Sequence, residues 1–446
     1  MNKVIIFKEH DQKAKFWGEK REINEEISGL LGLERDGHIR FEGVPKDKDA
    51  PKYLGIESTA EHLKAGYYIG ATWLKEGELA VVVTPKVEKI DYLEMFSSAL
   101  CVDSERASTY FSDYYGIEFD KPAIEVDEKF NIITPLILIH YISILLRLTK
   151  HGLKKGYVFR EENLRSKVKG HLLLHKHLQK NIVFKREDRA YCSFQEYTED
   201  IPENQLLKKA LLFAKNMINN SASLKKKQTI YESLKISANR LLAIFQNVSD
   251  EIEIHEVKSL KINKLFADYK EAVKIAKIIL RRFDYSLQNV KTDKNKTLPF
   301  WIDMPRLYEL YVYKWLKEKV KDDEILFQVE GYQGTAVDYV LKRQGIILDA
   351  KYKPRYENSN AGIIEDIREI SGYARDEKIL NKFENSNVDK VPCVILYPRE
   401  YEEMDLSEQE ENDRNDGFFA GQNANNIKRI KPYRSFYKMQ IDVPII

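Results

Sequence analysis

The sequence predicts a multidomain α+β protein, with a β-rich N-terminal domain, a mainly helical middle domain and a C-terminal α/β domain. The chain has 446 residues, more than one hydrophobic core usually holds. Its hydrophobic content of 43% and aromatic content of 11% are typical of globular proteins. The apolar pattern also changes along the chain from strand-like to helix-like, and then alternates. These changes place the domain boundaries at residues 1–125, 126–290 and 291–446.

In the first domain, short apolar runs separated by turn residues predict strands. Residues 67–73 and 79–83 form two such runs on either side of a turn at residues 75–77. Pro85 ends the second strand, because proline has no N–H to donate to a neighbouring strand.

In the middle domain, residues 204–214 and 265–283 repeat apolar side chains every three or four positions, which predicts helices. The most apolar run, residues 132–148, contains His140 and Arg147. A membrane-spanning helix needs about 20 cleanly apolar residues, so we interpret this run as a buried helix and expect no membrane association.

The third domain alternates predicted helices and strands. The lysine-rich residues 291–296 are a plausible boundary before it. The elements expected in order are a helix at 305–319, strands at 325–329, 336–342 and 345–352, a helix at 363–380 and a strand at 391–397. This order is typical of a compact α/β module.

The charge and cysteine content limit the classes of partner and compartment. Because 72 basic residues face 70 acidic ones, overall charge indicates no partner. Residues 147–189 contain thirteen Lys or Arg and four Asp or Glu, which suits either a phosphate backbone or acidic partner, or a solvated helical face. Cys101, Cys192 and Cys393 form no C-x-x-C pair, and no secretory signal is expected, so we predict a cytoplasmic protein.

Asp338 and Asp349 lie on successive predicted strands, and Lys351 follows Asp349 by two residues. Strand alternation places Asp349 and Lys351 on one face. Phosphodiester hydrolysis needs a divalent cation and a charge that stabilises the phosphate, and Mg²⁺ prefers oxygen ligands. We therefore predict a Mg²⁺ site, in which Mn²⁺ can substitute, held by Asp338, Asp349 and Ala350, with Lys351 orienting water or stabilising the phosphate. The alternative is a surface ion pair.

Several other side chains are candidates for roles beside this motif. Glu309 is either a further catalytic carboxylate or ordinary helix surface, and Lys353 either contacts phosphate or is simply exposed. Glu369 and Tyr373, four residues apart, share one face of a helix. The segment HLLLHKH at residues 171–177 lacks the H-E-x-x-H pattern, which favours basic surface over a metal site.

Asp338 with Asp349-Ala350-Lys351 resembles the active-site motif of the PD-(D/E)xK nuclease superfamily. In the superfamily motif a proline often precedes the first acid, but that position varies, and here it is Val337. Most of residues 60–400 also resemble the McrC family, the nuclease subunits of McrBC-type modification-dependent (type IV) restriction systems. The likeness rests on the order and spacing of residues 66–72, 79–86, 152–157, 162–164, 169–170, 194–200, 204–208, 304–309 and 366–374.

This resemblance implies an endonuclease that cuts double-stranded DNA containing modified cytosine. It implies that the N-terminal part docks onto a hexameric McrB-like AAA+ GTPase and stimulates its GTP hydrolysis. The chain itself has no G-x-x-x-x-G-K-[ST] loop for nucleotide. Glu369 stands where many relatives have glutamine, which leaves its role open. The alternatives are a free-standing nuclease and a non-catalytic GTPase-activating scaffold, and the intact Asp338, Asp349 and Lys351 argue against the scaffold.

Overall fold

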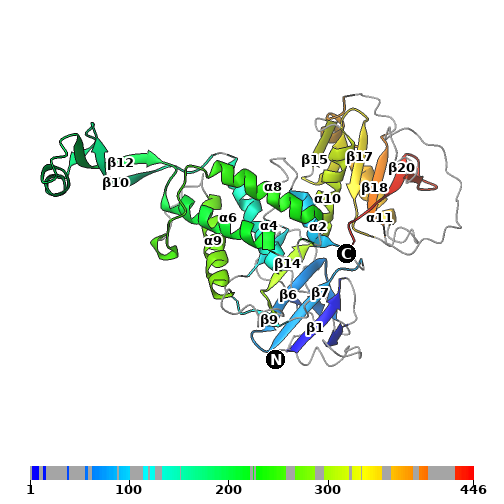
Figure 1. Cartoon of the computed structure of the whole chain (residues 1–446). Coiled ribbons are helices and arrows are strands. Elements are labelled where there is room, and N and C mark those ends of the chain that lie inside the picture. The colour runs from blue at the N-terminus through cyan, green and yellow to red at the C-terminus, as the bar shows by residue number, and fades with distance from the viewer. Residues whose placement is uncertain are drawn as a thin grey trace. The chain divides into compact units, whose positions relative to one another are not determined.

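The chain forms two compact units in a computed structural model (Figure 1). One unit joins residues 1–131 to residues 295–446, and the other comprises residues 132–294. The structure describes residues 3–9, 14–16, 38–39, 56–58, 63–87, 90–100, 114–118, 121–125, 133–150, 152–220, 225, 228–257, 267–286, 296–320, 324–332, 334–353, 363–384, 391–399 and 427–445. The three-domain division stays a prediction.

A six-stranded sheet is built around the predicted N-terminal strand pair. Its order is β2 (Ala14–Phe16), β1 (Lys3–Lys8), β7 (Leu79–Thr84), β6 (Tyr68–Lys75), β14 (Phe300–Asp303) and β8 (Tyr115–Ile117). The predicted pair is confirmed as antiparallel β6 and β7. Strand β14 comes from the predicted third domain. A Cβ at Gly70 would lie 2.0 Å from the carbonyl oxygen of Phe300, so β14 can approach β6 only because residue 70 is glycine.

Smaller elements complete this part of the chain. Helix α2 (Tyr92–Leu100) packs against α10 (Met304–Lys319). Two short sheets pair β9 (Ile124–Glu125) with β13 (Lys296–Thr297), and β3 (His38–Ile39) and β5 (Leu63–Ala65) with β4 (Ile56–Ser58).

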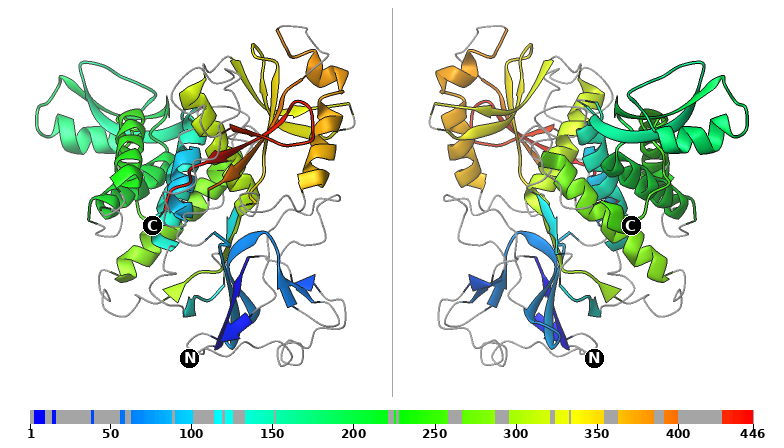
Figure 2. Two further views of the ribbon diagram at one scale, coloured as in Figure 1. Left: turned by 90° about the vertical axis from the view of Figure 1, so that its right-hand side faces the viewer. Right: turned by 90° about the vertical axis from the view of Figure 1, so that its left-hand side faces the viewer.

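The C-terminal α/β module contains a second six-stranded sheet (Figure 2). Its order is β15 (Ile325–Glu330), β16 (Ala336–Leu341), β17 (Ile346–Ala350), β18 (Cys393–Pro398), β20 (Phe436–Ile441) and β19 (Ile427–Arg429). Strands β17, β18 and β20 are parallel, and the other neighbouring pairs are antiparallel. The predicted helix at 305–319 is confirmed as α10, and the three predicted strands between residues 325 and 352 as β15, β16 and β17.

The predicted helix at 363–380 is instead two helices, α11 (Ile363–Tyr373) and α12 (Glu377–Leu380). Asp376 separates them, because its backbone is extended and its side chain accepts a hydrogen bond from the N–H of Lys378. That is the arrangement of a helix N-cap, which starts a new helix rather than continuing the old one.

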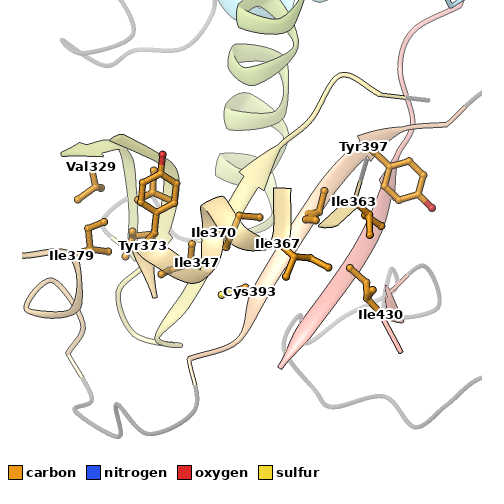
Figure 3. Close-up of a cluster of buried hydrophobic side chains, with 13 residues drawn as sticks. Val329, Ile347, Ile363, Ile367, Ile370, Tyr373, Ile379, Cys393, Tyr397 and Ile430 are labelled. Atoms are coloured by element: carbon orange, nitrogen blue, oxygen red, sulfur yellow. The ribbon is translucent and has the colours of Figure 1, made fainter. Parts of the chain in front are cut away.

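Helices α10 and α11 cover opposite faces of this sheet. On α10, Tyr313 stacks on Phe327 of β15 with ring centroids 4.6 Å apart, and Phe327 stacks on Tyr339 of β16. On the other face, isoleucines of α11 join a buried cluster with Ile347 of β17 and Cys393 of β18 (Figure 3). Because side chains alternate along a strand, this second face also carries Asp349.

The middle unit is a bundle of helices with a projecting arm. The helices are α4 (Ile133–Thr149), α6 (Pro202–Asn220), α8 (Gln228–Ile244) and α9 (Ala267–Ser286), with a 3-10 turn, η3, at Ile254–Glu256. Helices α4, α6 and α9 confirm the three helices predicted for this region. No helix in the described part of the chain is long and apolar enough to cross a membrane.

The arm is a feature that the sequence analysis did not identify. Strands β10 (Gly156–Arg165) and β12 (Arg189–Thr198) form an antiparallel ribbon that projects from the bundle of its unit (Figure 1). Its tip holds β11 (His171–Leu172), α5 (Leu174–His177) and a π-helical turn, η2, at Leu178–Ile182. One face of β10 is largely exposed, and on the other only Leu164 is buried, so the sequence of β10 shows little of the apolar alternation that predicts strands.

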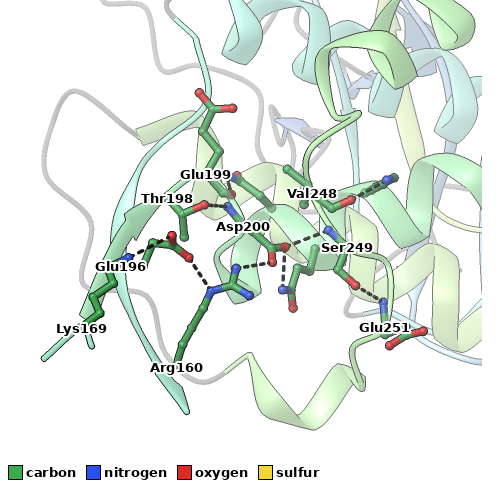
Figure 4. A network of polar contacts seen from close by, with 12 residues as sticks. Arg160, Lys169, Glu196, Thr198, Glu199, Asp200, Val248, Ser249 and Glu251 are labelled. Atoms are coloured by element: carbon green, nitrogen blue, oxygen red, sulfur yellow. Dashed lines mark hydrogen bonds and ion pairs between the residues drawn. The ribbon is translucent and has the colours of Figure 1, made fainter. Parts of the chain in front are cut away.

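A polar network fixes the base of the arm to the helices of its unit (Figure 4). Asp200 accepts hydrogen bonds from Nη2 of Arg160 at 3.1 Å, Nε2 of Gln205 at 2.8 Å and the N–H of Ser249 at 2.8 Å. Arg160 also forms an ion pair with Glu196 across the ribbon. Each oxygen of Asp200 therefore has a donor.

Candidate active site

Three polar residues form a row across the strands of the C-terminal sheet. Tyr339 pairs with Leu348, and Phe327 and Val329 pair with Tyr339 and Val337. Continuing these registers by one residue places Gln328, Asp338 and Asp349 opposite one another on β15, β16 and β17. Asp338 and Asp349 are 7% and 2% exposed, so two acids lie side by side with little water.

The carboxylate of Asp338 is held from both sides. Its Oδ2 accepts the N–H of Ala350 at 2.8 Å, and its Oδ1 accepts Nε2 of Gln328 at 3.0 Å. The N–H of Ala350 therefore bonds to a side chain, two residues beyond Leu348, which pairs with Tyr339 at this end of β16 and β17. At this end of the paired strands, the carboxylate of Asp338 takes the place of a backbone carbonyl as the acceptor for the N–H of Ala350.

Lys351 lies between two carboxylates. Its Nζ is 2.9 Å from Oδ2 of Asp349 and 2.9 Å from Oε2 of Glu369 on α11. The hydroxyl of Tyr373 donates to the other oxygen of Glu369 at 3.4 Å. The expected sharing of one strand face by Asp349 and Lys351, and of one helix face by Glu369 and Tyr373, is thus seen in direct contacts.

Glu309 of α10 reaches the same row. Its Oε2 accepts Nε2 of Gln328 at 3.1 Å, and its backbone carbonyl accepts the hydroxyl of Tyr339. Asp303 caps the start of α10 by accepting the N–H of Arg306 at 3.2 Å, with Pro305 in the first turn. The structure therefore brings Glu309 together with Asp338, while its catalytic role stays a proposal.

Crowding of acids dominates the electrostatics of this row. Burial, reinforced by the charge of Asp349, raises the pKa of Asp338 to about 8. Burial and the charge of Asp338 raise the pKa of Glu309 well above its usual range. Burial also raises the pKa of Asp349, although Lys351 opposes the shift. For Lys351, burial favours the neutral amine, but the surrounding carboxylates outweigh it and raise its pKa. A bound cation would relieve this repulsion.

A second ion pair lies beside the row, and only one of its members, Lys353, was predicted from the sequence. Nζ of Lys353 is 2.8 Å and 2.9 Å from the two oxygens of Asp366, a buried residue of α11. Asp366 occupies the first turn of that helix. An acid in a first turn is common, so no sequence signal marked it.

The donor set suits a hard divalent cation. Mg²⁺ takes oxygen ligands and commonly uses only one or two protein carboxylates. Within the described residues, Oδ2 of Asp349 is buried and has no aligned hydrogen-bond donor, although Lys351 lies near it. No cluster of three or more His, Cys, Asp or Glu in the described ranges is arranged to hold a metal. The fit therefore rests on Asp338 and Asp349, with Ala350 able to offer only its backbone carbonyl.

The histidines of the arm belong to the other unit. His175 contacts Gln179 at 3.0 Å, and Nδ1 of His177 contacts Asn181 at 2.9 Å. The basic segment at residues 147–189 largely forms the arm rather than a helical face.

One contact links the N-terminal sheet to the segment that follows β17. Nζ of Lys86 lies 4.0 Å from the ring centroid of Tyr352, the residue after Lys351. The same ammonium lies 3.2 Å from Oε1 of Glu9, which is 2% exposed. Burial outweighs the attraction of Lys86 and raises the pKa of Glu9 to about 7.

Comparisons with known proteins give one family and two solved assemblies. The model of the family described as McrBC 5-methylcytosine restriction system component matches residues 63–367. The chain is similar to a half-complex from a tetradecameric assembly of Thermococcus gammatolerans McrB AAA+ hexamers with bound McrC, at 14% identity and a TM-score of 0.38, over 98% of this chain and 94% of that chain. It is also similar to the T. gammatolerans McrBC complex, at 14% identity and a TM-score of 0.28, over 71% and 88% of the two chains. No curated protein matches the chain.

Proposed function

Since the chain belongs to the family of McrBC 5-methylcytosine restriction system components, we propose that it is the McrC-type subunit that cuts DNA in a GTP-dependent restriction complex. The observation that carries the nuclease assignment is the buried pair Asp338 and Asp349 with Lys351 in contact. Burying two carboxylates side by side costs free energy. Binding of a catalytic cation between them is a physical reason for a protein to keep both acids.

In this proposal Asp338, Asp349 and the carbonyl of Ala350 hold Mg²⁺, or Mn²⁺ in its place. The cation supplies Lewis acidity and an acidified water for attack on phosphorus. Lys351 lies 2.9 Å from Asp349, so its ammonium can orient that water or bind a phosphate oxygen. Glu369 holds the other side of Lys351 at 2.9 Å and so limits where the ammonium can move. Glu309, joined to Asp338 through Gln328, forms the wall of the site on the side of α10.

The substrate is double-stranded DNA that carries modified cytosine, and the partner is a McrB-like AAA+ GTPase hexamer whose hydrolysis this chain stimulates. The family description refers to 5-methylcytosine restriction, which supports that substrate class. The absence of a nucleotide-binding loop from the whole sequence supports a division of labour, with GTP bound by the partner. The complex is expected to act in the cytoplasm.

The deciding experiment is cleavage of cytosine-methylated DNA by the full chain with Mg²⁺, GTP and its co-purified GTPase. Asp349→Ala and Lys351→Ala should abolish cutting and leave stimulation of GTP hydrolysis intact. The matched control is Glu384→Gln, which alters an exposed acid of the same module 4.0 Å from Lys342.

Each of the other possible results would support a different function. Full cleavage by either alanine variant would disprove the site. Cleavage without partner or GTP would favour a free-standing nuclease. GTPase stimulation by a wild-type chain that never cuts would favour a non-catalytic scaffold.

A further inference from the structure

Gln328 has an unusual backbone conformation for a strand residue. Its φ is +49°, in the left-handed region, although it lies inside β15 between two residues that pair with β16. The other described non-glycine residues with positive φ are Ser166, Lys185 and Ser435, and all three lie in turns or bends. A left-handed backbone brings Cβ close to the carbonyl oxygen, so this conformation must be held by something else.

The side chain of Gln328 shows what holds it. A single nitrogen, Nε2, donates to Oε2 of Glu309 at 3.1 Å and to Oδ1 of Asp338 at 3.0 Å. These two acids belong to different elements, α10 and β16, and repel one another. The amide is therefore the one described side-chain donor shared by both carboxylates.

We propose that Gln328 is a positioning residue, whose amide holds Glu309 and Asp338 together in the arrangement that receives the divalent cation. This inference rests on the proposed function, because it assigns a metal to that row. In this arrangement Glu309 lies near the cation because the amide of Gln328, a neutral residue outside any recognised motif, connects it to Asp338. Partners that orient metal-binding carboxylates typically change metal affinity by about 10- to 100-fold.

A purely structural role makes a different prediction. If Gln328 only stabilised the fold, its loss would lower thermal stability. If its backbone is strained to serve the site, Gln328→Gly should relieve that strain and leave the melting temperature unchanged or higher, while metal affinity falls. The two readouts then move in opposite directions, which is the pattern expected where strain serves a binding site.

The test measures binding of Mn²⁺ alone to the full chain by calorimetry, together with thermal unfolding in the absence of metal. Gln328→Gly should weaken Mn²⁺ binding by at least about tenfold without lowering the melting temperature. Ser435→Gly is the matched control, because Ser435 has φ +61° in a turn. It should gain similar backbone relief and bind Mn²⁺ as the wild type does.

Wild-type affinity in Gln328→Gly would overturn the role of Gln328 alone. A parallel loss of stability and affinity would also overturn it, in favour of a structural role. Failure of the wild-type chain to bind Mn²⁺, or undiminished binding by Asp349→Asn, would instead overturn the proposed metal site and the inference with it.

Discussion

Asp200 at the base of the arm and Asp349 in the C-terminal sheet each lie beside one basic residue, but the other partners of their carboxylates differ. Asp200 receives three donors, from Arg160, Gln205 and Ser249. Burial opposes its ionisation, but these donors outweigh burial and hold the pKa of Asp200 below its usual value. Asp349 has Lys351 beside it and acids around it, and its pKa is raised.

The difference separates two uses of a carboxylate that is at least half-buried. A carboxylate whose oxygens are all satisfied stabilises its surroundings, as Asp200 does for the arm. A group of acids with too few donors costs stability until a cation arrives, which is the state of the row in the C-terminal sheet. The same residue type is therefore structural in one unit and a candidate metal ligand in the other.

The strongest test of this contrast is Asp349→Asn, which keeps the shape and removes one negative charge. DNA cleavage by the complex should fall by at least about 10³-fold, because the cation loses a ligand. The stability of the metal-free chain should change by less than about 1 kcal/mol, because repulsion among the acids is relieved. Urea unfolding beside the cleavage assay would check both, and a large loss of stability would contradict the contrast.

Glu9 supplies an intermediate case, a buried acid with one cationic partner. Its pKa is about 7 in the folded protein and 4.5 ordinarily. Between these values the folded chain keeps a proton that the unfolded chain has lost. The contribution of Glu9 to the free energy of unfolding is thus fully present below about pH 4.5 and is lost as the pH rises through 7. The shift corresponds to about 3 kcal/mol.

Substituting Glu9→Gln should flatten this part of the stability profile, measured by urea unfolding between pH 4.5 and pH 8. Glu76→Gln, at an exposed position of the same sheet's β6–β7 turn, is the control and should keep the wild-type profile. An unchanged slope in Glu9→Gln would show that Lys86 keeps Glu9 ionised throughout.

On the structural side of the comparison, Asp200→Ala should destabilise the middle unit by about 2 kcal/mol, because Nη2 of Arg160 and the N–H of Ser249 would lose their acceptor. Mn²⁺ binding should not change. Unfolding in urea measures the first effect and calorimetry the second. Asp250→Ala, at the exposed position next to Ser249, is the matched control. Equal stability of the two variants would refute the structural role of Asp200.

The smallest expected effect concerns the hydroxyl of Tyr339, which donates to the backbone carbonyl of Glu309. Tyr339→Phe should cost about 1 kcal/mol of stability, the usual value of one buried hydrogen bond. Cleavage should stay within a few-fold of wild type, because Gln328 still holds the carboxylate of Glu309. Tyr332→Phe, at a residue 71% exposed, serves as the control. A loss of cleavage as large as that of Asp349→Asn would show that α10 itself must be held for catalysis.

The sequence by itself determined the family and several local elements of the C-terminal module. Apolar runs of strand length and a capped helix are local signals, so β15 to β17 and α10 could be predicted from the residues that form them. The placing of Asp349 and Lys351 on one face follows equally from strand alternation. The resemblance to McrBC-type systems is confirmed by the family match over residues 63–367.

Only the tertiary structure decided the partners of those residues, because they depend on strand order and register rather than on local pattern. The arm escaped prediction since only Leu164 of β10 is buried. Strand β14 joined the N-terminal sheet through a close approach at Gly70 that no local signal marks. Gln328 carries no motif, yet the register places it opposite Asp338, and its left-handed backbone lets one amide reach two acids. The alternation of side chains along a strand determines the face on which a residue lies, but the pairing between strands determines which residues it contacts.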